Sequence, residues 1–600
     1  MSSSRSSDPA PEQLAAWRAQ VDKELAGAPF DKLIYTTAEG FAIQPLYTER
    51  AVDPGLPGAA PYARGGSAEA RPFQICMRVD PPALRRPGAL AEDVEAGADA
   101  LWIGSGDGEA ADLAARHDLV LVEEDPATPS VDVLGERTRR VPHGSPEQQP
   151  SATRWSAHDP VATATSGLVV AEALPEVVGA LAAVVRGYTA RPSLRRCVRV
   201  SSLAFHDAGA DAADELALIL STAAAYLRAL VAEGLELDRV TEALWVQVAV
   251  GRDTFGELCK LRALRVVWHK LLAAAGARDT ALAAMHAVCS SRTVAHRDPW
   301  VNMLRVTTQV FAAALGGAQL ITPLSFDDGS GAASAQGRRL ARNTALILRE
   351  ESHLGRVIDP AGGAYYVEAR TDALAREAWS RFTQLERDGG IIRALVTGAL
   401  RERLGAAWSR RAAAIARRKE PVLGVSEFAN LGEQLPASAA IGTPIGPAKP
   451  VASALAAHRD GEAFESLRDR IEAAPRDVVL VTMGPPIEHR ARAGYAASLF
   501  ATAGLRTREL AAPDGTAAIA EASGGIDIAC LCGSDERYAG EAVARAGELR
   551  AAGARKIVLA GRPGAREAEL RAAGIDAFIY MGCDVLATLT ELVAGARRDA

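Results

Sequence analysis

The sequence predicts an α/β protein in which a (β/α)8 TIM-type barrel precedes a smaller, flavodoxin-like doubly wound domain. From about residue 73 to 430, apolar strand-like runs alternate with stretches of helical periodicity. A stretch rich in Pro, Gly and Ala then interrupts the alternation, and four short apolar runs that end in glycine follow it. Near-continuous apolar runs are typical of parallel strands buried on both faces. Their number in the first region favours a barrel over an open sheet.

Length and composition exclude several classes of protein. Of 600 residues, 48% are hydrophobic and 24% charged, as in a globular protein with a large core. No run reaches the roughly 18 apolar residues of a membrane span, and the N-terminus lacks the apolar segment of a secretory signal. The net charge of −7 argues against a nucleic-acid partner. Seven cysteines without a CxxC pair give no zinc signature, and we expect a cytoplasmic protein with no membrane partner.

Residues 1–45 are expected to form a helical N-terminal extension. Apolar side chains recur there at steps of three and four residues, at Leu14, Trp17, Val21 and Leu25. This spacing predicts an amphipathic helix, and the glycine and proline that follow predict its end. The apolar stripe needs a second surface to cover it. That surface is either the chain's own barrel or a partner subunit, and we expect the barrel.

The barrel is expected to span residues 46–430. Strand-like runs occur at residues 100–103, 197–205, 243–250, 286–291 and 319–326. Helical periodicity separates these runs, with the longest stretches at residues 214–234 and 255–276. Residues 125–160 are rich in Pro, Ser and charge, which predicts a long loop.

A linker and the second domain are expected to follow the barrel. Residues 431–475 contain ASAAIGTPIGPAKP and are predicted to be a linker. The second domain, residues 476–600, has strand-like runs at residues 477–484, 526–533, 556–561 and 576–582. The ligand site of a doubly wound domain lies at the carboxyl ends of its strands.

Five strings of the chain carry a family resemblance. They are GLPGAAPYARG (55–65), KLRALRVVW (260–268), DPWVNMLRVTTQVFAAALGGAQLI (298–321), RLARNTALILREESHLGRVIDPAGGAYYVEARTDALA (339–375) and GVSEF (424–428). These strings resemble the methylmalonyl-CoA mutase family. The resemblance covers nearly the whole chain. It implies a barrel that, in catalytic members, encloses the tail of an acyl-CoA, and a second domain of the cobalamin-binding type. Catalytic members isomerise methylmalonyl-CoA to succinyl-CoA with adenosylcobalamin.

The barrel motifs depart from those of catalytic members. Those members carry a substrate-binding arginine and a cofactor-facing tyrosine in R-P-W-T-I-R-Q-Y-A-G-F. The matching RPFQICMRVDP puts Cys76 at the arginine's place and Arg78 at the tyrosine's. A guanidinium is costly in an apolar pocket unless it is paired. The family's histidine before E-A-G-A falls on Ala204. His206 lies two residues later, so on a strand it would either substitute from the same face or be a polar residue at the strand end.

The second domain departs from the cobalamin motif D-x-H-x-x-G. In that motif the histidine binds cobalt, the aspartate orients the histidine, and the glycine lets the chain pass under the corrin. His489 takes the histidine's place, Ile487 the aspartate's and Arg492 the glycine's. His489 is therefore a residual candidate for cofactor binding. The alternative interpretation is that His489 is a solvated surface histidine. We assign no other cofactor ligand, no metal site and no catalytic residue.

With these departures the chain resembles the small (beta), non-catalytic subunit of heterodimeric members. The strings CLCGSDERYAGEAV (530–543) and GIDAFIYMGCDVLATL (574–589) are similar to that subunit. The resemblance implies an isomerase subunit that stabilises a homologous large subunit, with acyl-CoA and adenosylcobalamin bound by that partner and a degenerate cobalamin-type domain here. The alternatives are a self-sufficient cobalamin-dependent mutase with an altered site and a regulatory acyl-CoA-binding chain. If the barrel is non-catalytic, side chains should fill its axis.

Overall fold

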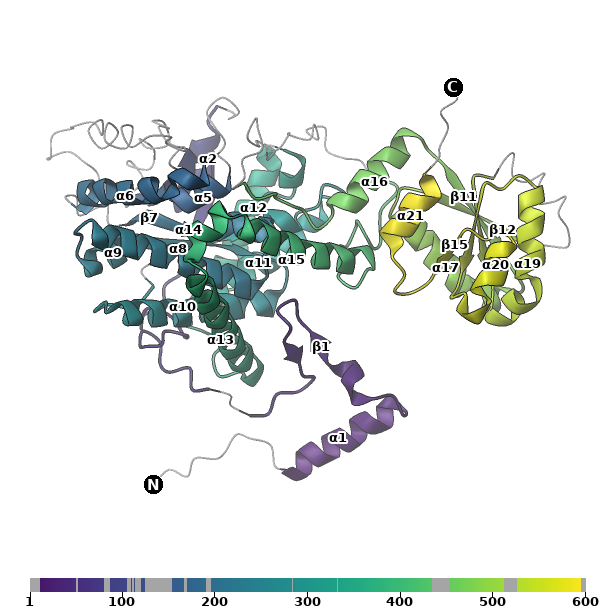
Figure 1. Ribbon diagram of the computed structural model, residues 1–600, viewed down its shortest axis with the longest axis horizontal. Helices are drawn as coiled ribbons and strands as arrows, with labels where there is room; N and C mark the ends of the chain where they lie inside the picture. The colour runs from purple at the N-terminus through teal and green to yellow at the C-terminus, as the bar shows by residue number, and fades with distance from the viewer. Residues whose placement is uncertain are drawn as a thin grey trace.

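The computed structural model contains two α/β bodies and a projecting N-terminal arm (Figure 1). One body is a closed parallel barrel and the other is built on a five-stranded parallel sheet. The structure describes residues 11–594 apart from 50–51, 80–86, 105–119 (with 109 and 113 kept), 125–153, 167–169, 190–195, 283, 332, 434–453 and 512–525.

The barrel closes in the strand order β10-β3-β4-β5-β6-β7-β8-β9. Its strands are β3 Gln74–Arg78, β4 Ala100–Gly104, β5 Val120–Glu124, β6 Arg154–His158, β7 Arg196–Ser201, β8 Leu244–Val250, β9 Met285–Cys289 and β10 Leu320–Thr322. Strand β10 pairs in parallel with both β9 and β3, which closes the ring. The α/β barrel predicted from the alternating pattern is confirmed.

Helices surround the barrel strands (Figure 1). They are α2 Ala89–Glu95, α5 Pro160–Thr165, α6 Leu174–Thr189, α7 Leu203–Asp207, α8 Ala212–Ala232, α9 Leu237–Ala243, α10 Thr254–Ala275, η4 Ser291–Thr293, α11 Val301–Leu315, α12 Ala335–Leu346, η6 Ile347–Glu351, α13 Tyr365–Arg387, α14 Gly390–Val396 and α15 Ala399–Ala416. Among the described helices, α8 alone is long and apolar enough to cross a membrane, and 78% of its most apolar window is buried inside the protein. Packing within the barrel body therefore accounts for its composition.

Two segments of the predicted organisation differ in the structure. The loop predicted over residues 125–160 ends in strand β6, while residues 125–153 lie outside the described part. Strand β6 is short, and its apolar residues Trp155 and Ala157 are separated by a serine in the sequence, so its apolar signal is weak. The linker predicted over residues 431–475 contains helix α16, Glu462–Ala473, while the Pro/Gly/Ala stretch lies largely in the undescribed residues 434–453.

The second body is a parallel sheet in the order β12-β11-β13-β14-β15. Its elements are β11 Asp477–Thr482, α17 Pro486–Ala501, β12 Arg506–Ala511, β13 Ile528–Cys532, α19 Asp535–Ala551, β14 Lys556–Ala560, α20 Glu567–Ala572, β15 Ala577–Ile579 and α21 Val585–Val593. The four predicted strand-like runs all contain strands. Strand β12 was not predicted, because it pairs only with β11 at the sheet edge and its polar side chains are largely exposed. One apolar cluster lies under α16, α17 and α21 and another under α19 and α20.

Ion pairs of the buried Arg297 side chain join helix α16 to the barrel. The Arg297 guanidinium pairs with Asp469 and with Glu472, at 2.7 Å, on that helix. It also pairs with Glu433 at 3.3 Å. The backbone N–H groups of His296 and Arg297 donate to Glu465 Oε1 at 2.6 and 3.3 Å. The second body is therefore fixed to the carboxyl side of the barrel by charge-assisted hydrogen bonds.

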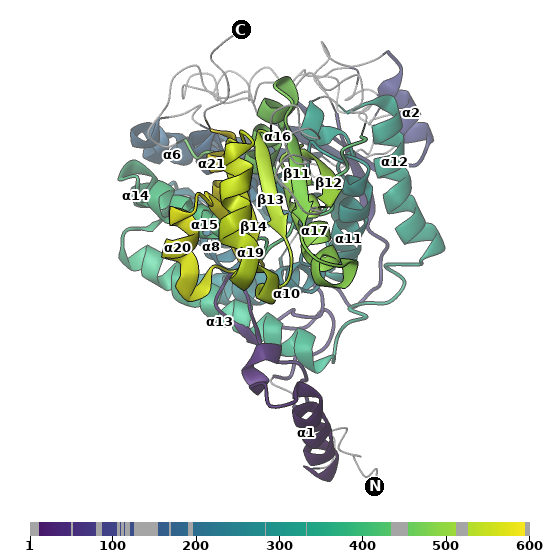
Figure 2. The same cartoon turned by 90° about the vertical axis from the view of Figure 1, so that its right-hand side faces the viewer.

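The N-terminal arm leaves the barrel instead of packing on it. It comprises α1 Pro11–Leu25, η1 Phe30–Leu33 and a hairpin of β1 Tyr35–Thr36 and β2 Ala42–Ile43. No residue of α1 is buried, and both views show the helix projecting away from the two bodies (Figures 1 and 2). The expectation that the barrel covers the apolar stripe is wrong. The ring contact of α1 is made within the arm, where Trp17 meets Phe30 edge-on at 6.3 Å.

Large side chains fill the barrel axis. Trp155 and Trp245 lie with ring centroids 5.4 Å apart and pack with Cys76 and other small residues of the strands. The Trp102 ring lies 5.6 Å from the imidazole of His286, which stands 6.3 Å from the Trp245 ring. These side chains come from strands β3, β4, β6, β8 and β9. The prediction of a filled axis is therefore met by the described interior residues.

Replacing Trp245 tests this packing. Trp245→Ala should lower the free energy of unfolding by about 3–5 kcal/mol, because it empties a fully buried site among rigid neighbours. The control is Trp300→Ala, whose indole is 45% exposed and stacked on Phe326. This control substitution should lower the free energy of unfolding by about 1 kcal/mol. Urea unfolding followed by circular dichroism measures both, and equal losses would contradict a packed axis.

Candidate functional site

Cys76 and Arg78 lie on strand β3 but face different surroundings. Cys76 is buried in the axial cluster, and burial raises the pKa of its thiol to about 12, so it stays neutral. Arg78 ends the strand and is exposed. Its guanidinium lies 5.9 Å from the Trp102 ring centroid, and its carbonyl accepts from Arg338 at 2.7 Å. Exposure spares Arg78 the expected desolvation cost, and neither residue offers the phenol or the deep cation of the catalytic motif.

Ala204 and His206 lie on the short helix α7 and not on a strand. Strand β7 ends at Ser201, and α7 covers Leu203–Asp207. Residues that are two positions apart on a helix differ by about 200° around its axis, so Ala204 and His206 do not share a face. The argument that His206 substitutes from the same strand face is therefore wrong. Ala204 offers no proton-transferring group at the histidine's place.

His206 is enclosed in a buried hydrogen-bond network. Its Nδ1 lies 2.7 Å from Glu215 Oε1, and its Nε2 lies 2.6 Å from the Ser290 hydroxyl. Burial and the positive charge of Arg292 lower the pKa of His206, which favours the neutral ring. Burial alone would raise the pKa of Glu215, but Lys260 and His206 lower it to about 2. We therefore assign the proton to Nδ1, which donates to the carboxylate, while Nε2 accepts from Ser290.

Lys260 completes this network from helix α10. Its fully buried ammonium lies 3.1 Å from Glu215 and 2.6 Å from Glu257, and donates to the Ala249 carbonyl at 2.8 Å. The serine–histidine–carboxylate order matches that of hydrolase triads. However, Ser290 is buried and does not line the neighbouring cavity. The network therefore stabilises the carboxyl end of the barrel and presents no accessible nucleophile.

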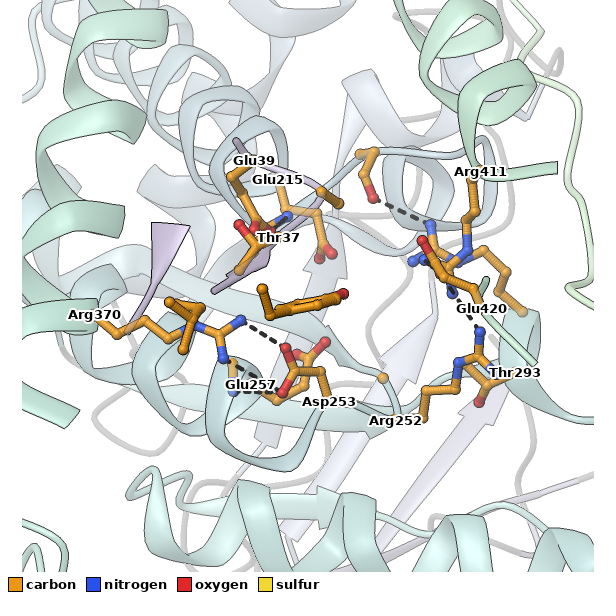
Figure 3. A pocket seen from close by; sticks show the side chains of 18 of the residues that line it. Thr37, Glu39, Glu215, Arg252, Asp253, Glu257, Thr293, Arg370, Arg411 and Glu420 are labelled. Atoms are coloured by element: carbon orange, nitrogen blue, oxygen red, sulfur yellow. Dashed lines mark hydrogen bonds and ion pairs between the residues drawn. The ribbon is translucent and has the colours of Figure 1, made fainter. Parts of the chain in front are cut away.

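A charged cavity of about 460 Å³ lies beside this network (Figure 3). Its lining comes from the turns that follow β7 and β8, from η4, from α13 and α15, and from the hairpin of the N-terminal arm. Local sequence patterns do not predict this cavity, because its residues come from segments far apart in the chain.

The cobalamin-motif positions lie at the first turn of helix α17. Ile487 is 92% exposed and has no group that could orient a ligand. His489 Nδ1 lies 3.1 Å from the Gly484 carbonyl, to which it donates. The adjacent Glu488 pairs with Arg537 at 2.7 Å and not with the histidine. The structure therefore places His489 on the surface without the carboxylate partner of the family motif.

Arg492, on the same helix, reaches the carboxyl end of strand β13. Its guanidinium donates to the Gly533 carbonyl at 2.8 Å and to Asp535 at 2.6 Å. It also lies 4.9 Å from the centroid of the Tyr538 ring. A glycine at this position would leave open space, whereas the arginine fills the space and closes it with hydrogen bonds.

Tyr538 fills the neighbouring space over strands β13 and β14. Its hydroxyl accepts from Gly533 N–H at 2.9 Å and lies 3.1 and 2.9 Å from the carbonyl oxygens of Leu531 and Ala560. These carbonyls lie at the carboxyl ends of their strands, where a doubly wound domain binds its ligand. The residues at this edge do not fit adenosylcobalamin. Within the described ranges, no group of three or more His, Cys, Asp or Glu side chains could hold a metal ion.

Comparisons with known proteins match most of the chain to one family. A family model described as methylmalonyl-CoA mutase matches residues 176–494. The methylmalonyl-CoA mutase small subunit of Streptomyces virginiae is 37% identical over 95% of this chain and 93% of its own length. The chain belongs to the methylmalonyl-CoA mutase family. The small subunit of Propionibacterium freudenreichii subsp. shermanii is 36% identical over 66% of this chain and 62% of its own length. The methylmalonyl-CoA mutase of Escherichia coli (strain K12) is 27% identical, with corresponding shares of 69% and 63%.

Motif comparison alone missed the residues that fill the two sites of this family member. Trp155 and Trp245 lie at strand positions that face the axis, and Tyr538 lies five residues after Gly533. A signal for the tryptophans was present, since large aromatic residues recur in several strand-like runs. For Tyr538 there was none, because only the fold brings its hydroxyl over two strand ends.

The Glu215 network predicts a specific pH dependence. The pKa of Glu215 is lowered from 4.5 to about 2 in the folded chain. Its carboxylate therefore stabilises the fold above pH 4.5, and this contribution is lost as the pH falls toward 2. Glu215→Gln should be less stable at pH 7 by about 3 kcal/mol, with a shallower loss of stability below pH 4.5. Thermal unfolding from pH 2.5 to 7 measures this, with the exposed Glu242→Gln as control. Parallel curves for Glu215→Gln and wild type would exclude the assignment.

Proposed function

We propose that the chain is a non-catalytic small subunit that pairs with and stabilises a homologous catalytic large subunit. The complex would isomerise methylmalonyl-CoA to succinyl-CoA in the cytoplasm. The observation that carries this proposal is the barrel axis, which tryptophan side chains occupy where a catalytic member needs room for the acyl-CoA. Relatives with 36–37% identity bear the name of the small subunit, which supports a large-subunit partner.

The second body supports the same division of labour. Its strand order corresponds to 2-1-3-4-5, the flavodoxin-like order, and this supports a domain of cobalamin-binding type. Arg492 and Tyr538 nevertheless close the edge where the cofactor would bind. Adenosylcobalamin and the acyl-CoA are therefore assigned to the partner, and this chain supplies surface and stability.

The uncovered N-terminal helix supports pairing. Its apolar stripe contains Leu14, Trp17, Val21 and Leu25, which are only partly buried. Burial of apolar surface is favourable by roughly 25 cal/mol per Å² in free energy. A homologous subunit is a partner large enough to cover these side chains. We therefore assign the stripe to the contact with the large subunit.

A self-sufficient mutase would need groups that the described site residues do not supply. His489 would have to bind cobalt without an orienting carboxylate, and Arg78, at the exposed mouth, would have to replace a phenol. No observation on this chain favours that alternative over the non-catalytic subunit.

Cobalamin titration of the purified chain tests the assignment of the cofactor. The chain alone should cause no saturable change in the visible absorbance of hydroxocobalamin and should show no turnover of methylmalonyl-CoA. The large subunit, titrated in parallel, is the positive control. A histidine-bound spectrum that disappears in His489→Ala, or turnover by the chain alone, would overturn the proposal.

Charge placed on the stripe of α1 tests the assigned contact. The double variant Trp17→Asp, Val21→Asp should weaken association with the large subunit by about tenfold or more, because interface aromatic residues carry much of the binding energy. Ala19→Asp adds a charge to the opposite, exposed face of the same helix and should bind normally. Sedimentation velocity of the mixed subunits measures both. Unchanged association of the double variant would remove α1 from the interface.

A further inference from the structure

The charged cavity lies between the barrel's carboxyl end and the hairpin of the arm. Arg292 in η4 follows strand β9, and Ala212 begins helix α8. Thr37 and Glu39 of the hairpin cover the cavity from the other side, as Figure 3 shows. A volume of about 460 Å³ suits a metabolite of few heavy atoms and is at the small end for ligand pockets.

Most charged side chains in the cavity wall already have partners of opposite charge. Arg370 pairs with Asp253 at 2.6 Å, and Arg411 pairs with Glu420 at 3.1 Å (Figure 3). Arg411 also forms two hydrogen bonds of 2.7 Å with Asp460 behind the wall. These pairs neutralise one another and leave little net charge for a ligand.

Arg292 is the exception among the buried cations of this wall. It is 6% exposed, and no carboxylate of the described residues lies within 4.0 Å of its guanidinium. One terminal nitrogen donates to the carbonyls of His206 and Ala210, the latter at 3.1 Å, while Nε has no hydrogen-bond partner. Burial and the charge of Arg411 lower the pKa of Arg292, whereas the charges of Asp460, Glu215 and Asp207, all beyond 4.0 Å, raise it. A buried cation without an adjacent counterion is unfavourable by several kcal/mol.

Arg265 shows how a buried arginine is satisfied without a carboxylate. Its Nε donates to the Tyr62 carbonyl at 3.0 Å, and its two terminal nitrogens donate to Gly316 and Ala63 at 2.6 and 3.1 Å. All three nitrogens are thus used by the protein, and Arg265 does not line the cavity. Arg292 uses one terminal nitrogen in this way, and its Nε is buried without a partner, as the Nε of Arg370 is. Its second terminal nitrogen forms no hydrogen bond with the described residues, and this nitrogen is the group left for a ligand.

Two helix N-termini add positive potential to the same cavity. Ala212 of α8 and Gly256 of α10 both line it, and each helix exceeds 20 residues. The N-terminus of a helix attracts anions through its dipole and its free N–H groups. Both of these N–H groups are already used by carboxylates, since Ala212 N–H donates to Glu39 at 3.2 Å and Gly256 N–H donates to Asp253 at 3.0 Å. The wall therefore binds carboxylate oxygen in the present structure.

We propose that this cavity binds a small oxyanion, the carboxylate or phosphate group of a metabolite, with Arg292 as its main ligand. Guanidinium groups bind both anions through paired hydrogen bonds. The exposed Lys419 at the cavity wall adds a second cation on the solvent side. Because the hairpin of the arm forms one side of the cavity, a bound anion would also hold the arm against the barrel.

Isothermal titration of the full chain with succinate and, separately, with inorganic phosphate tests this site. At matched ionic strength, at least one should bind saturably with a Kd of about 1 mM or tighter. Succinate binding without phosphate binding would identify a carboxylate ligand, the reverse a phosphate, and equal binding a general oxyanion site. Arg292→Gln should weaken binding by about tenfold or more.

Arg265→Gln is the matched control, because it removes another buried arginine and should leave binding unchanged. Lys419→Glu is a second variant that tests the site if Arg292→Gln fails to fold. It reverses an exposed charge at the wall and should weaken binding several-fold without loss of folding, checked by circular dichroism. Absence of saturable binding by both anions, or binding that neither Arg292→Gln nor Lys419→Glu weakens, would overturn the proposal.

Discussion

The packing of the barrel interior is the constraint on which the rest of the structure depends. A closed eight-stranded barrel must fill its axis with side chains unless a ligand occupies it. In this chain Trp155 and Trp245 meet on the axis at 5.4 Å, and the small side chains of Cys76 and Ala100 make room for them. The same packing that stabilises the barrel therefore leaves its axis occupied by described side chains.

The carboxyl end of the barrel is held by a second set of buried contacts. Lys260 and Glu215 neutralise each other there, the neutral His206 ring donates to Glu215, and residues 455–460 cross the same end. In that crossing segment, backbone N–H groups of His458 and Asp460 donate to the carbonyls of Asp207 and Arg292 at 2.9 and 2.8 Å. Active sites of such barrels lie at this end. Here the polar groups of that end are used for internal hydrogen bonds and ion pairs.

Sequence patterns predicted five of the eight barrel strands, β4 and β7 to β10, because near-continuous apolar runs such as β8 are decided locally. They did not predict β3 and β5, and they placed β6 in a loop. They also failed for β12, because the polar side chains of this edge strand give no apolar run. Helix α16 was missed although Phe464, Leu467 and Ile471 have helical spacing, because the Pro/Gly/Ala stretch before it led to the prediction of a linker. Motif register located the site positions, including Cys76. It did not predict what fills the sites, since contacts such as that of Tyr538 with two strand ends depend on tertiary structure.

Two features of the described residues are not explained by the packing of the axis and of the strand-end edge. The apolar clusters of the barrel and of the second body are buried, whereas no residue of α1 is buried. Arg370 and Arg411 pair directly with carboxylates at the cavity, whereas no carboxylate of the described residues lies within 4.0 Å of the Arg292 guanidinium. Both features involve the arm, because α1 belongs to it and its hairpin covers Arg292's cavity. Covering the stripe and neutralising the guanidinium would therefore both act on the arm, so partner association and anion binding should be thermodynamically coupled through it.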